Sequence, residues 1–451
     1  MDAVRRIGLA ALAGALATMA LAGGGCKKKV EADLVLVSPH SKQIEEEFER
    51  DFRAWHQEKF GADVRLRWMD VGGSTTCTQY LIRRYGRSDT SGIDLYFGGG
   101  GPDHKLLTAR GLTEPVTLPK DLLAAVPETI TGVKQYDAQG RWYGAAISCF
   151  GILYNAKLLK DHNIPVPKTW ADLAAPAMFG RIAAADATNS GSARAAYEMI
   201  IQSAANWQVG WERLLKIFAN CKRFTGGASE VVRDVANGEV LAGAAIDFYA
   251  YGQIALSGDV LGFTLVRGTT AFTPDPICLL KGAPHPEMAK RFMEYVFTAR
   301  AQKLWCLPAG SDGGPQTHAL YRQPIRRDVY ATCAGRMLPG LVDPFEYAPN
   351  FHLDEAKAAV RISRLLGPLM KAAAKDSRTQ LSAAYKAILD AGSPADLRRQ
   401  FAALPPDLAS EDIALKTAKR LADPAEADEI TAKWQRYFRT KYEDIIAKAK
   451  K

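Results

Sequence analysis

A short polar turn near the middle of the chain has the composition of an anion-binding site. It spans residues 189–192 (NSGS), after an apolar run at 179–185 that predicts a buried strand and before a predicted helix at 193–201. This order directs free backbone N–H groups and the positive end of a helix dipole at one point. Ser190 and Ser192 add hydroxyl donors, and Gly191 permits close approach. The alternative is that one serine is only a helix N-cap, and this segment alone does not decide between the two.

Three similar turns follow predicted strands in the first hundred residues. The strands at 34–37, 64–69 and 93–97 end in SPHS, GGSTT and GGGG respectively. Ligands of parallel α/β sheets bind at the carboxyl ends of strands, so these turns are candidate contacts. A helix is expected after each of the first two turns. No helix is expected directly after the four glycines, because Pro102 follows them. The candidate ligand-binding residues here are Ser38, His40, Gly73, Ser74, Gly99 and Gly100.

Signatures of catalysis are missing from the sequence. It contains no H-E-x-x-H, G-x-S-x-G or G-x-x-x-x-G-K-[ST] pattern, and its seven histidines are scattered. The cysteines form no Cys-x-x-Cys pair, which disfavours a structural zinc site. We therefore expect a protein that is not an enzyme and has no cofactor.

Length and charge limit the classes of function. A chain of 451 residues predicts two or three domains, and the net charge of +9 is not concentrated in a basic tract. Without an aromatic and basic ladder, nucleic-acid binding has little support. A small anionic ligand agrees equally well with a mildly basic protein.

The N-terminus has the pattern of an export signal. Arg5 and Arg6 precede an apolar run at 7–22, which is too short for a comfortable transmembrane helix. Cys26 follows three glycines, as at a bacterial lipoprotein cleavage site, although Gly23 departs from the usual leucine. Residues 1–26 are thus predicted to be a signal peptide with Cys26 as the lipidation site; an ordinary cleaved signal is the alternative. An exported location permits disulfides, but sequence cannot choose a pairing among Cys77, Cys149, Cys221, Cys278, Cys306 and Cys333.

The alternation of strands and helices predicts an α/β fold. Further strands are expected at 140–148, 151–155, 240–247 and 277–280, and one long helix at 286–304. From residue 354 onward the pattern is helical, with breaks near 392–394 and 405–406. A stripe of apolar residues in the last helix is expected to pack on the chain's own body rather than on a permease. The stripe comprises Trp434, Tyr437, Phe438, Tyr442, Ile445 and Ile446.

Several segments together resemble a known family. LVLVSPHS, IDLYFGGG, GRWYGAAIS with YN, PVPKTWADLAAPAMFGRI with NSGSA, GEVLAGAAID and ICLLKGAPHPEMAKRFMEYVFTARAQ occur in this order. The set resembles extracellular solute-binding proteins of bacterial ABC importers, in the branch of ferric-ion, phosphonate, sugar-phosphate and polyamine binders. The resemblance runs over roughly residues 34–315.

The resemblance implies a two-lobe clamp of the type II periplasmic-binding fold. One lobe would comprise residues 34–139 and 273–345 and the other residues 140–272, with 346–451 as a helical C-terminal extension. A small molecule would be bound in the cleft as the lobes close about a hinge. The implied partner is an ABC permease in the inner membrane. The implied location is the periplasm, with a lipid anchor as the protein's only attachment to the membrane.

The sequence departs from the iron-binding members of this family. Those members use a histidine after the first strand, a carboxylate after the third and two adjacent tyrosines in the second lobe. His40 and Tyr249 could serve, but the third strand ends in glycines and Phe248 replaces a tyrosine. Hard Fe(III) requires anionic oxygen ligands, so an organic anion such as a sugar phosphate or phosphonate is favoured.

The remaining candidate contacts lie at the ends of two later strands. They are Ser148, Asp247 and Tyr249. Asp247 could accept a bond from a sugar hydroxyl or an amine, or be a structural acid. Three alternatives stay open: a ferric-ion importer component, a ligand-sensing lipoprotein of a signalling system, and an exported enzyme on the same fold.

Overall fold

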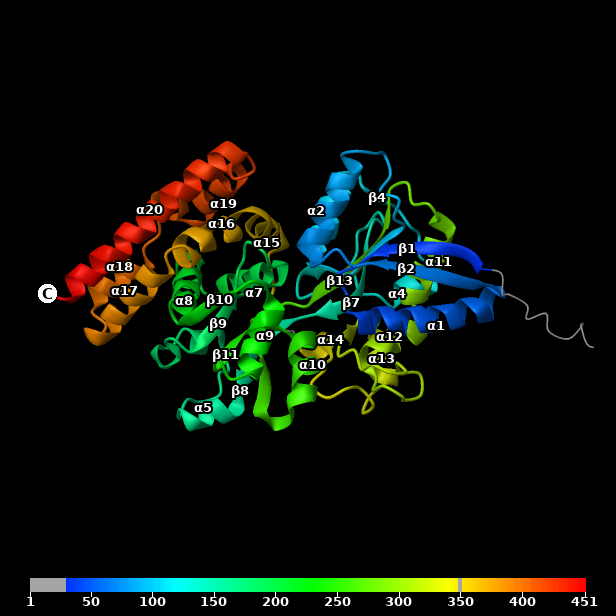
Figure 1. Cartoon of the computed structure of the whole chain (residues 1–451), viewed down its shortest axis with the longest axis horizontal. Helices are drawn as coiled ribbons and strands as arrows, with labels where there is room; N and C mark the ends of the chain where they lie inside the picture. The colour runs from blue at the N-terminus through cyan, green and yellow to red at the C-terminus, as the bar shows by residue number, and fades with distance from the viewer. Residues whose placement is uncertain (1–29, 348–350) are drawn as a thin grey trace, which may run out of the picture.

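The computed structural model describes residues 30–347 and 351–451. The predicted signal peptide and Cys26 lie outside these residues. The chain forms two α/β bodies side by side, and the C-terminal helices cover the far side of one of them (Figure 1). Among the described helices, none is both long and apolar enough to cross a membrane.

The first lobe is built on a seven-stranded mixed sheet. Its order is β14-β7-β13-β3-β1-β2, with β4 paired to β13. The parallel core consists of β1 (Val30–Val37), β2 (Asp63–Met69) and β3 (Leu95–Phe97), and β13 (Thr273–Leu280) runs antiparallel to β3. Both faces are buried at β3, whereas the edge strand β2 exposes Arg65 and Arg67 on one face. Helices on these faces include α1 (Lys42–Phe60), α2 (Ser74–Tyr85) and α3 (Gly101–Ala109).

The second lobe has a five-stranded sheet in the order β10-β9-β11-β8-β12. Its central strands are β9 (Ile182–Ala185), β11 (Ala242–Ile246) and β8 (Phe150–Asn155), flanked by β10 (Cys221–Thr225) and β12 (Leu261–Leu265). The helices α7 (Gly191–Gln202), α8 (Trp207–Ala219), α9 (Ala228–Ala236) and α10 (Asp247–Ser257) belong to this lobe.

The chain crosses between the two sheets at two neighbouring points. The strand β7 (Tyr143–Ser148) pairs with β13 and β14 of the first sheet, whereas β8 pairs with β11 and β12 of the second. The first crossing therefore lies at Cys149, later than the boundary expected between residues 139 and 140. The second crossing lies between β12 and β13, at the expected place. We expect these two crossings to act as the hinge of the clamp.

Two local predictions were wrong. The single helix expected at 286–304 is two helices, α11 (Pro286–Val296) and α12 (Ala299–Cys306), because Thr298 caps a new helix by accepting a bond from Ala301 N. A helix does follow the glycine turn: α3 begins at Gly101, with Pro102 in its first turn. Proline at the first helical positions loses no hydrogen bond and fits the helical φ, which explains why it starts this helix.

The C-terminal extension is an all-helical layer on the second lobe. It begins with α15 (Glu355–Val360), which continues without a break through the π-helical segment η3 (Arg361–Leu365), α16 (Leu366–Met370) and the π-helical segment η4 (Lys371–Lys375). Then follow α17 (Arg378–Asp390), α18 (Ala395–Ala402), η5 (Pro406–Leu408), α19 (Glu411–Arg420) and α20 (Pro424–Ala449). The breaks predicted near 392–394 and 405–406 are confirmed.

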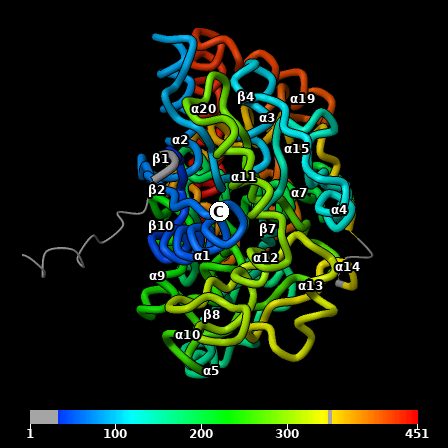
Figure 2. The backbone as a smooth tube through the Cα atoms, turned by 90° about the vertical axis from the view of Figure 1, so that its right-hand side faces the viewer, coloured from blue at the N-terminus to red at the C-terminus, as the bar shows by residue number. Residues whose placement is uncertain are grey.

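The extension and the second lobe share one hydrophobic core. Trp434, Phe438, Tyr442 and Ile445 are fully buried in the same cluster as the strands of the second sheet, and Tyr437 and Ile446 pack against it. The prediction that this stripe packs on the chain's own body is confirmed. In Figure 2, where the first lobe faces the viewer, the extension, drawn in orange and red, is seen behind it along the top of the molecule.

The remaining elements are short. They are β4 (Thr113–Glu114), α4 (Lys120–Ala124), β5 (Thr129–Ile130), β6 (Val133–Lys134), α5 (Ala156–Asp161), α6 (Trp170–Leu173), η1 (Pro176–Met178), η2 (Gly258–Val260), β14 (Gln323–Pro324), α13 (Arg327–Thr332) and α14 (Pro344–Tyr347).

Candidate binding cleft

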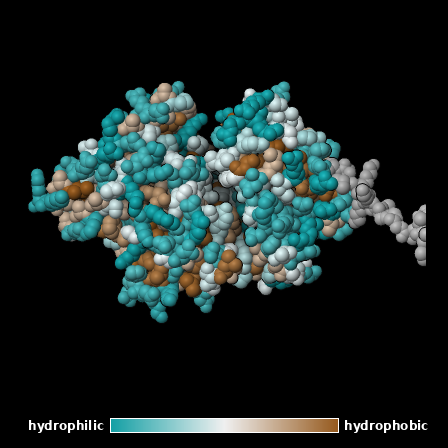
Figure 3. All heavy atoms as spheres, in the orientation of Figure 1, coloured by the Kyte–Doolittle hydropathy of each residue, from teal (hydrophilic) through white to brown (hydrophobic). Residues whose placement is uncertain are grey.

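The space-filling view shows a notch at the top of the molecule, where α2 faces the helices of the C-terminal extension (Figures 1 and 3). Ser74 starts α2 and Gly191 starts α7, and a Cβ placed on Gly191 would lie 3.6 Å from Ser74 Oγ. The N-terminal turns of two helices from different lobes therefore meet, and both present backbone N–H groups there.

The glycine turn of the first lobe is packed too tightly for side chains. Gly98 and Gly99 have positive φ angles of 93° and 86°. A Cβ at Gly98 would lie 2.5 Å from His40 Nε2, and one at Gly99 would lie 2.4 Å from the Tyr96 hydroxyl. These glycines bring the backbone against His40 and toward α2, and Gly100 is the N-cap of α3.

His40 is a buried histidine that uses neither ring nitrogen. Its ring is 8% exposed and packs edge-on against Phe97 with 4.7 Å between ring centroids. Neither Nδ1 nor Nε2 has a hydrogen-bond partner within the described part of the chain. Burial, with a smaller effect of Arg322, holds the pKa of His40 well below its ordinary value, so the ring is neutral near pH 7. Ser38 is fully buried and accepts a bond from His40 N, which fixes the turn.

Arg322, which no sequence pattern singled out, is a buried cation between the two lobes. Its side chain is nearly fully buried, pairs with Asp275 and lies over the Phe248 ring, 3.7 Å from guanidinium carbon to centroid. Burial lowers the pKa of Arg322 to about 10, so it stays charged at neutral pH. Its Nε has no acceptor among the residues that the structure describes.

Three of the predicted residues surround this arginine. Ser148 donates to Asp275 at 3.0 Å, which orients the carboxylate that pairs with Arg322. Asp247 is fully buried, accepts from Gln323 at 2.8 Å through Oδ2, and has no partner for Oδ1 in residues 30–347 and 351–451. Burial raises the pKa of Asp247, and its bonds from Gln323 and Cys149 oppose that rise.

Tyr249 lies at the second-lobe wall of the same region. Its side chain is partly exposed, and its ring packs on Phe248 with 4.4 Å between centroids. Tyr249 and Asp247 both oppose the lowering of the Arg322 pKa that burial causes. The first and second lobes thus both contribute polar groups around Arg322.

A second missed arginine joins the lobes directly. Arg194, in the first turns of α7, donates to Ala187 O at 2.9 Å and to Thr75 Oγ1 of the first lobe at 3.4 Å. Asp103 of α3 is close enough to oppose the lowering of the Arg194 pKa that burial causes. The Nε of Arg194 finds no acceptor in the described residues. Arg194 is therefore a cation that links α7 of the second lobe to the start of α2 in the first.

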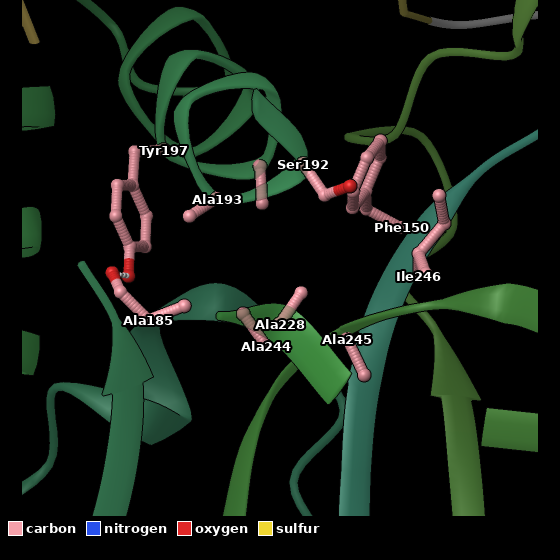
Figure 4. Close-up of a pocket in the computed structure, with 10 residues that line it drawn as sticks. Phe150, Ala185, Ser192, Ala193, Tyr197, Ala228, Ala244, Ala245 and Ile246 are labelled. Carbon is pink, nitrogen blue, oxygen red and sulfur yellow. Dashed lines mark hydrogen bonds between the residues drawn. The ribbon is translucent and has the colours of Figure 1, made fainter. Parts of the chain in front are cut away.

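Ser190 is a helix N-cap, as the alternative interpretation of the NSGS turn stated. Its Oγ accepts from Ala193 N at 3.1 Å. The hydroxyl proton remains available to a ligand, so capping and ligand binding are compatible. Ser192 lines a small cavity under the start of α7, among alanines at the ends of β9 and β11 (Figure 4).

Grouping the predicted residues by contact gives two sets along one cleft. The first set surrounds the facing helix N-termini and comprises Gly73, Ser74, Gly99, Gly100, Ser190, Gly191 and Ser192. The second set comprises Ser148, Asp247 and Tyr249 around Arg322, together with His40 and with Ser38, which accepts a bond from His40 N. Gly98, which touches His40, connects the two. In the described residues no group of three or more His, Cys, Asp or Glu side chains is placed to hold a metal ion.

This fold and cleft define a two-lobe solute-binding protein. A family model described as bacterial extracellular solute-binding protein matches residues 90–319, slightly more than half of the chain. The chain belongs to this family, and the family resemblance inferred from sequence is confirmed.

Solved structures with the same fold bind different ligands. The periplasmic binding protein AfuA from Actinobacillus pleuropneumoniae, with fructose-6-phosphate bound, is 18% identical, with a TM-score of 0.58 over 79% of this chain and 98% of that one. Iron-bound HitA from Pseudomonas aeruginosa is 19% identical, with a TM-score of 0.54 over 73% of this chain and 98% of that one. Identities this low establish that this chain shares the fold of these proteins, and nothing about its ligand.

A curated relative is similar over a shorter stretch. The phosphoglycerate transport regulatory protein PgtC of Salmonella typhimurium is 28% identical over 159 residues, which are 35% of this chain and 39% of PgtC. The match therefore spans well under half of either protein.

Proposed function

We propose that this protein captures a small organic anion, such as a sugar phosphate or phosphonate, and delivers it to the permease of an ABC importer. One observation carries the proposal: Arg322 is buried and charged between Asp275 of the first lobe and Phe248 of the second, and its Nε has no acceptor among the described residues. Guanidinium groups and helix N-termini are the usual donors to phosphate and carboxylate oxygens. His40 and Asp247, each with an unused polar atom, suit the hydroxyl groups of such a ligand.

The relatives agree with an anionic ligand. AfuA was solved with a sugar phosphate, and the name of PgtC refers to phosphoglycerate transport. Both ligands carry a phosphate monoester, which is the group that an arginine fork and helix N-termini recognise. The family consists of binding proteins, so the ligand is expected to leave the cleft chemically unchanged.

Thermal-shift screening tests the ligand class. A ligand that binds only the folded state raises the free energy of unfolding, by about 2.7 kcal/mol at a concentration of 100 times Kd. The melting temperature rises accordingly. We expect stabilisation by sugar phosphates or phosphonates and none by the matching unphosphorylated sugars. Equal stabilisation by neutral sugars would contradict the anion proposal.

The ferric-ion alternative meets an electrostatic obstacle. The Arg322 guanidinium stacks on Phe248, the residue that replaces one of the paired iron-binding tyrosines, and lies beside Tyr249. A fixed buried cation repels Fe(III) at the place where Tyr249 would ligate it. Ferric loading is expected to give no visible tyrosinate-to-iron absorption band; such a band, lost in Tyr249→Phe, would revive the iron alternative.

A sensing role is the second candidate, favoured by the word "regulatory" in the name of PgtC. A sensor would present the closed, ligand-bound clamp to a membrane signalling protein instead of a permease. Uptake of a radiolabelled ligand in cells with and without the protein distinguishes the two. Loss of uptake supports the importer, whereas normal uptake with altered ligand-induced transcription supports the sensor.

We also propose that Cys26 anchors the protein to the membrane by a lipid. The sequence signal described above supports it, and the family is extracellular. Cys26→Ser should move the protein from the membrane fraction to the soluble fraction. An unchanged distribution would favour the ordinary cleaved signal.

A further inference from the structure

The turn that carries Ser190 is organised by one buried carboxylate. Asp186 directly follows β9 and is 2% exposed. Its Oδ1 accepts from Thr188 N at 2.8 Å and from Thr188 Oγ1 at 2.7 Å. Its backbone oxygen accepts from Asn189 N at 3.2 Å and from Ser190 N at 3.0 Å. The Asp186 side chain therefore fixes Thr188, and its backbone oxygen holds the last two residues before α7.

The cation that neutralises Asp186 comes from the C-terminal extension. Lys375 donates to Asp186 Oδ2 across 189 residues of sequence. Burial alone would raise the pKa of Asp186, but the bonds from Lys375 and Thr188 hold that pKa below its ordinary value. The carboxylate is thus ionised, which its role as acceptor of several bonds requires.

The same helix touches the next residue of the turn. Ala187 N lies 3.2 Å from Met370 Sδ, and the backbone at Gly367 lies against Ala187 and Thr188. Residues five apart on an α-helix, such as 370 and 375, point about 140° away from each other. The π-helical segment η4 (Lys371–Lys375) has a wider turn, with bonds between residues five apart, and brings Met370 and Lys375 toward one face.

The extension is fixed on α7 at a second place. Arg361 and Glu198 are both fully buried and form a charged pair, with 2.8 Å between Nε and Oε1. Because Lys375 contacts residue 186 and Arg361 contacts residue 198, the extension helix runs antiparallel to α7. The extension therefore holds both the start and the middle of the helix whose N-terminus faces the cleft.

We propose that Lys375 is a positioning residue for ligand binding: the C-terminal extension sets the shape of the second-lobe turn at 186–190 through the Lys375–Asp186 pair. Lys375 itself does not touch the ligand. Without it, the Asp186 carboxylate near the α7 N-terminus loses its cation. The turn then keeps its contact between Ala187 and Met370 but loses the one through Asp186. This inference rests on the proposed anion-binding function, since it concerns the same cleft.

The test compares Lys375→Met with Lys375→Arg and a matched control. The control is Lys386→Met, which removes an exposed lysine paired with Asp390 on the same extension. The Lys375 side chain is 42% exposed, so its replacement leaves the core intact. We expect Lys375→Met to raise the Kd for fructose 6-phosphate about tenfold, the equivalent of one charge-assisted hydrogen bond. Lys375→Arg should restore the affinity, and the control should leave it unchanged.

Amide hydrogen exchange of the ligand-free protein provides a readout that needs no ligand. We expect the amides of residues 187–194 to exchange faster in Lys375→Met and at the normal rate in Lys386→Met. Normal exchange of these amides, or faster exchange with unchanged affinity, would overturn the inference. If the wild type binds no phosphorylated anion but the turn still exchanges faster in Lys375→Met, the proposed ligand class fails while the positioning role holds.

Discussion

Replacing Arg322 by methionine is the most informative perturbation of the cleft. Methionine keeps much of the unbranched side-chain volume that packs on Phe248 but removes the buried charge. The arginine is 4% exposed, so its bond to an anion would be made almost without water. A hydrogen bond to a charged group contributes about 1.5–3 kcal/mol, which corresponds to a loss of affinity of about 10- to 150-fold.

Removing Arg322 also leaves Asp275 without its cation. The unpaired carboxylate, held only by Ser148, would repel an anion and exaggerate the loss. The double variant Arg322→Met with Asp275→Asn removes this repulsion and isolates the contribution of the arginine. Arg336→Met, at an exposed arginine that donates to Asp312 O, is the matched control.

Isothermal titration calorimetry with the anion that stabilises the wild type in thermal-shift screening gives the affinities. We expect a weakening of at least about tenfold in the single and the double variants and none in the control. Unfolding curves on the same samples show whether each variant is folded at the titration temperature. Affinity within twofold of wild type in a folded double variant would refute the assignment of Arg322 to the ligand.

Three further predictions concern the cap, the pH dependence and the extension. Ser190→Ala with Ser192→Ala should cost about 1 kcal/mol of unfolding free energy through the lost cap and should also weaken anion binding; unchanged affinity in titrations would leave Ser190 as a cap alone. Burial lowers the pKa of His104 to about 4 from 6.5, so below pH 6.5 the unfolded chain binds a proton that the folded one refuses. His104 should therefore contribute about 2 kcal/mol to the stability that is lost in urea unfolding from pH 7 to 5, and His104→Gln should remove about that share; an identical pH profile in the variant would argue against it. Arg361→Met should cost about 3–5 kcal/mol by leaving Glu198 buried and unpaired, and Glu198→Gln added to it should restore part of the loss in the same assay.

The fold could be predicted from sequence where a local pattern decided the outcome. The runs 34–37 and 64–69 are β1 and β2, because uninterrupted or alternating apolar residues between turn signals are typical of strands. The break at Thr298 was missed because Phe297 and the residues around it keep a helical apolar spacing. The cap that divides the helices depends on one side chain, and the spacing of apolar residues does not report it.

The site could be predicted only in its turns. Gly73, Ser74 and Gly191 follow strands, so the topology alone brings them to one edge of each sheet. Arg322 lies in a long connection between α12 and β14, and Arg194 lies inside a helix that looks ordinary. Their function depends on contacts with Asp275 and with Thr75, 119 residues away from Arg194, and on the docking of two lobes. No local pattern encodes such contacts.

The sharing of one core by the second lobe and the last helix has a consequence for how the molecule is made. Strand β8 begins at Phe150, whereas Tyr442 and Ile445, buried in the same cluster, are among the last ten residues of the chain. The first sheet likewise waits for β13, which is synthesised after the whole of the second sheet. Contacts so distant in sequence form slowly, because a long loop must close first. The second lobe is therefore expected to complete its core only after α20 has been synthesised.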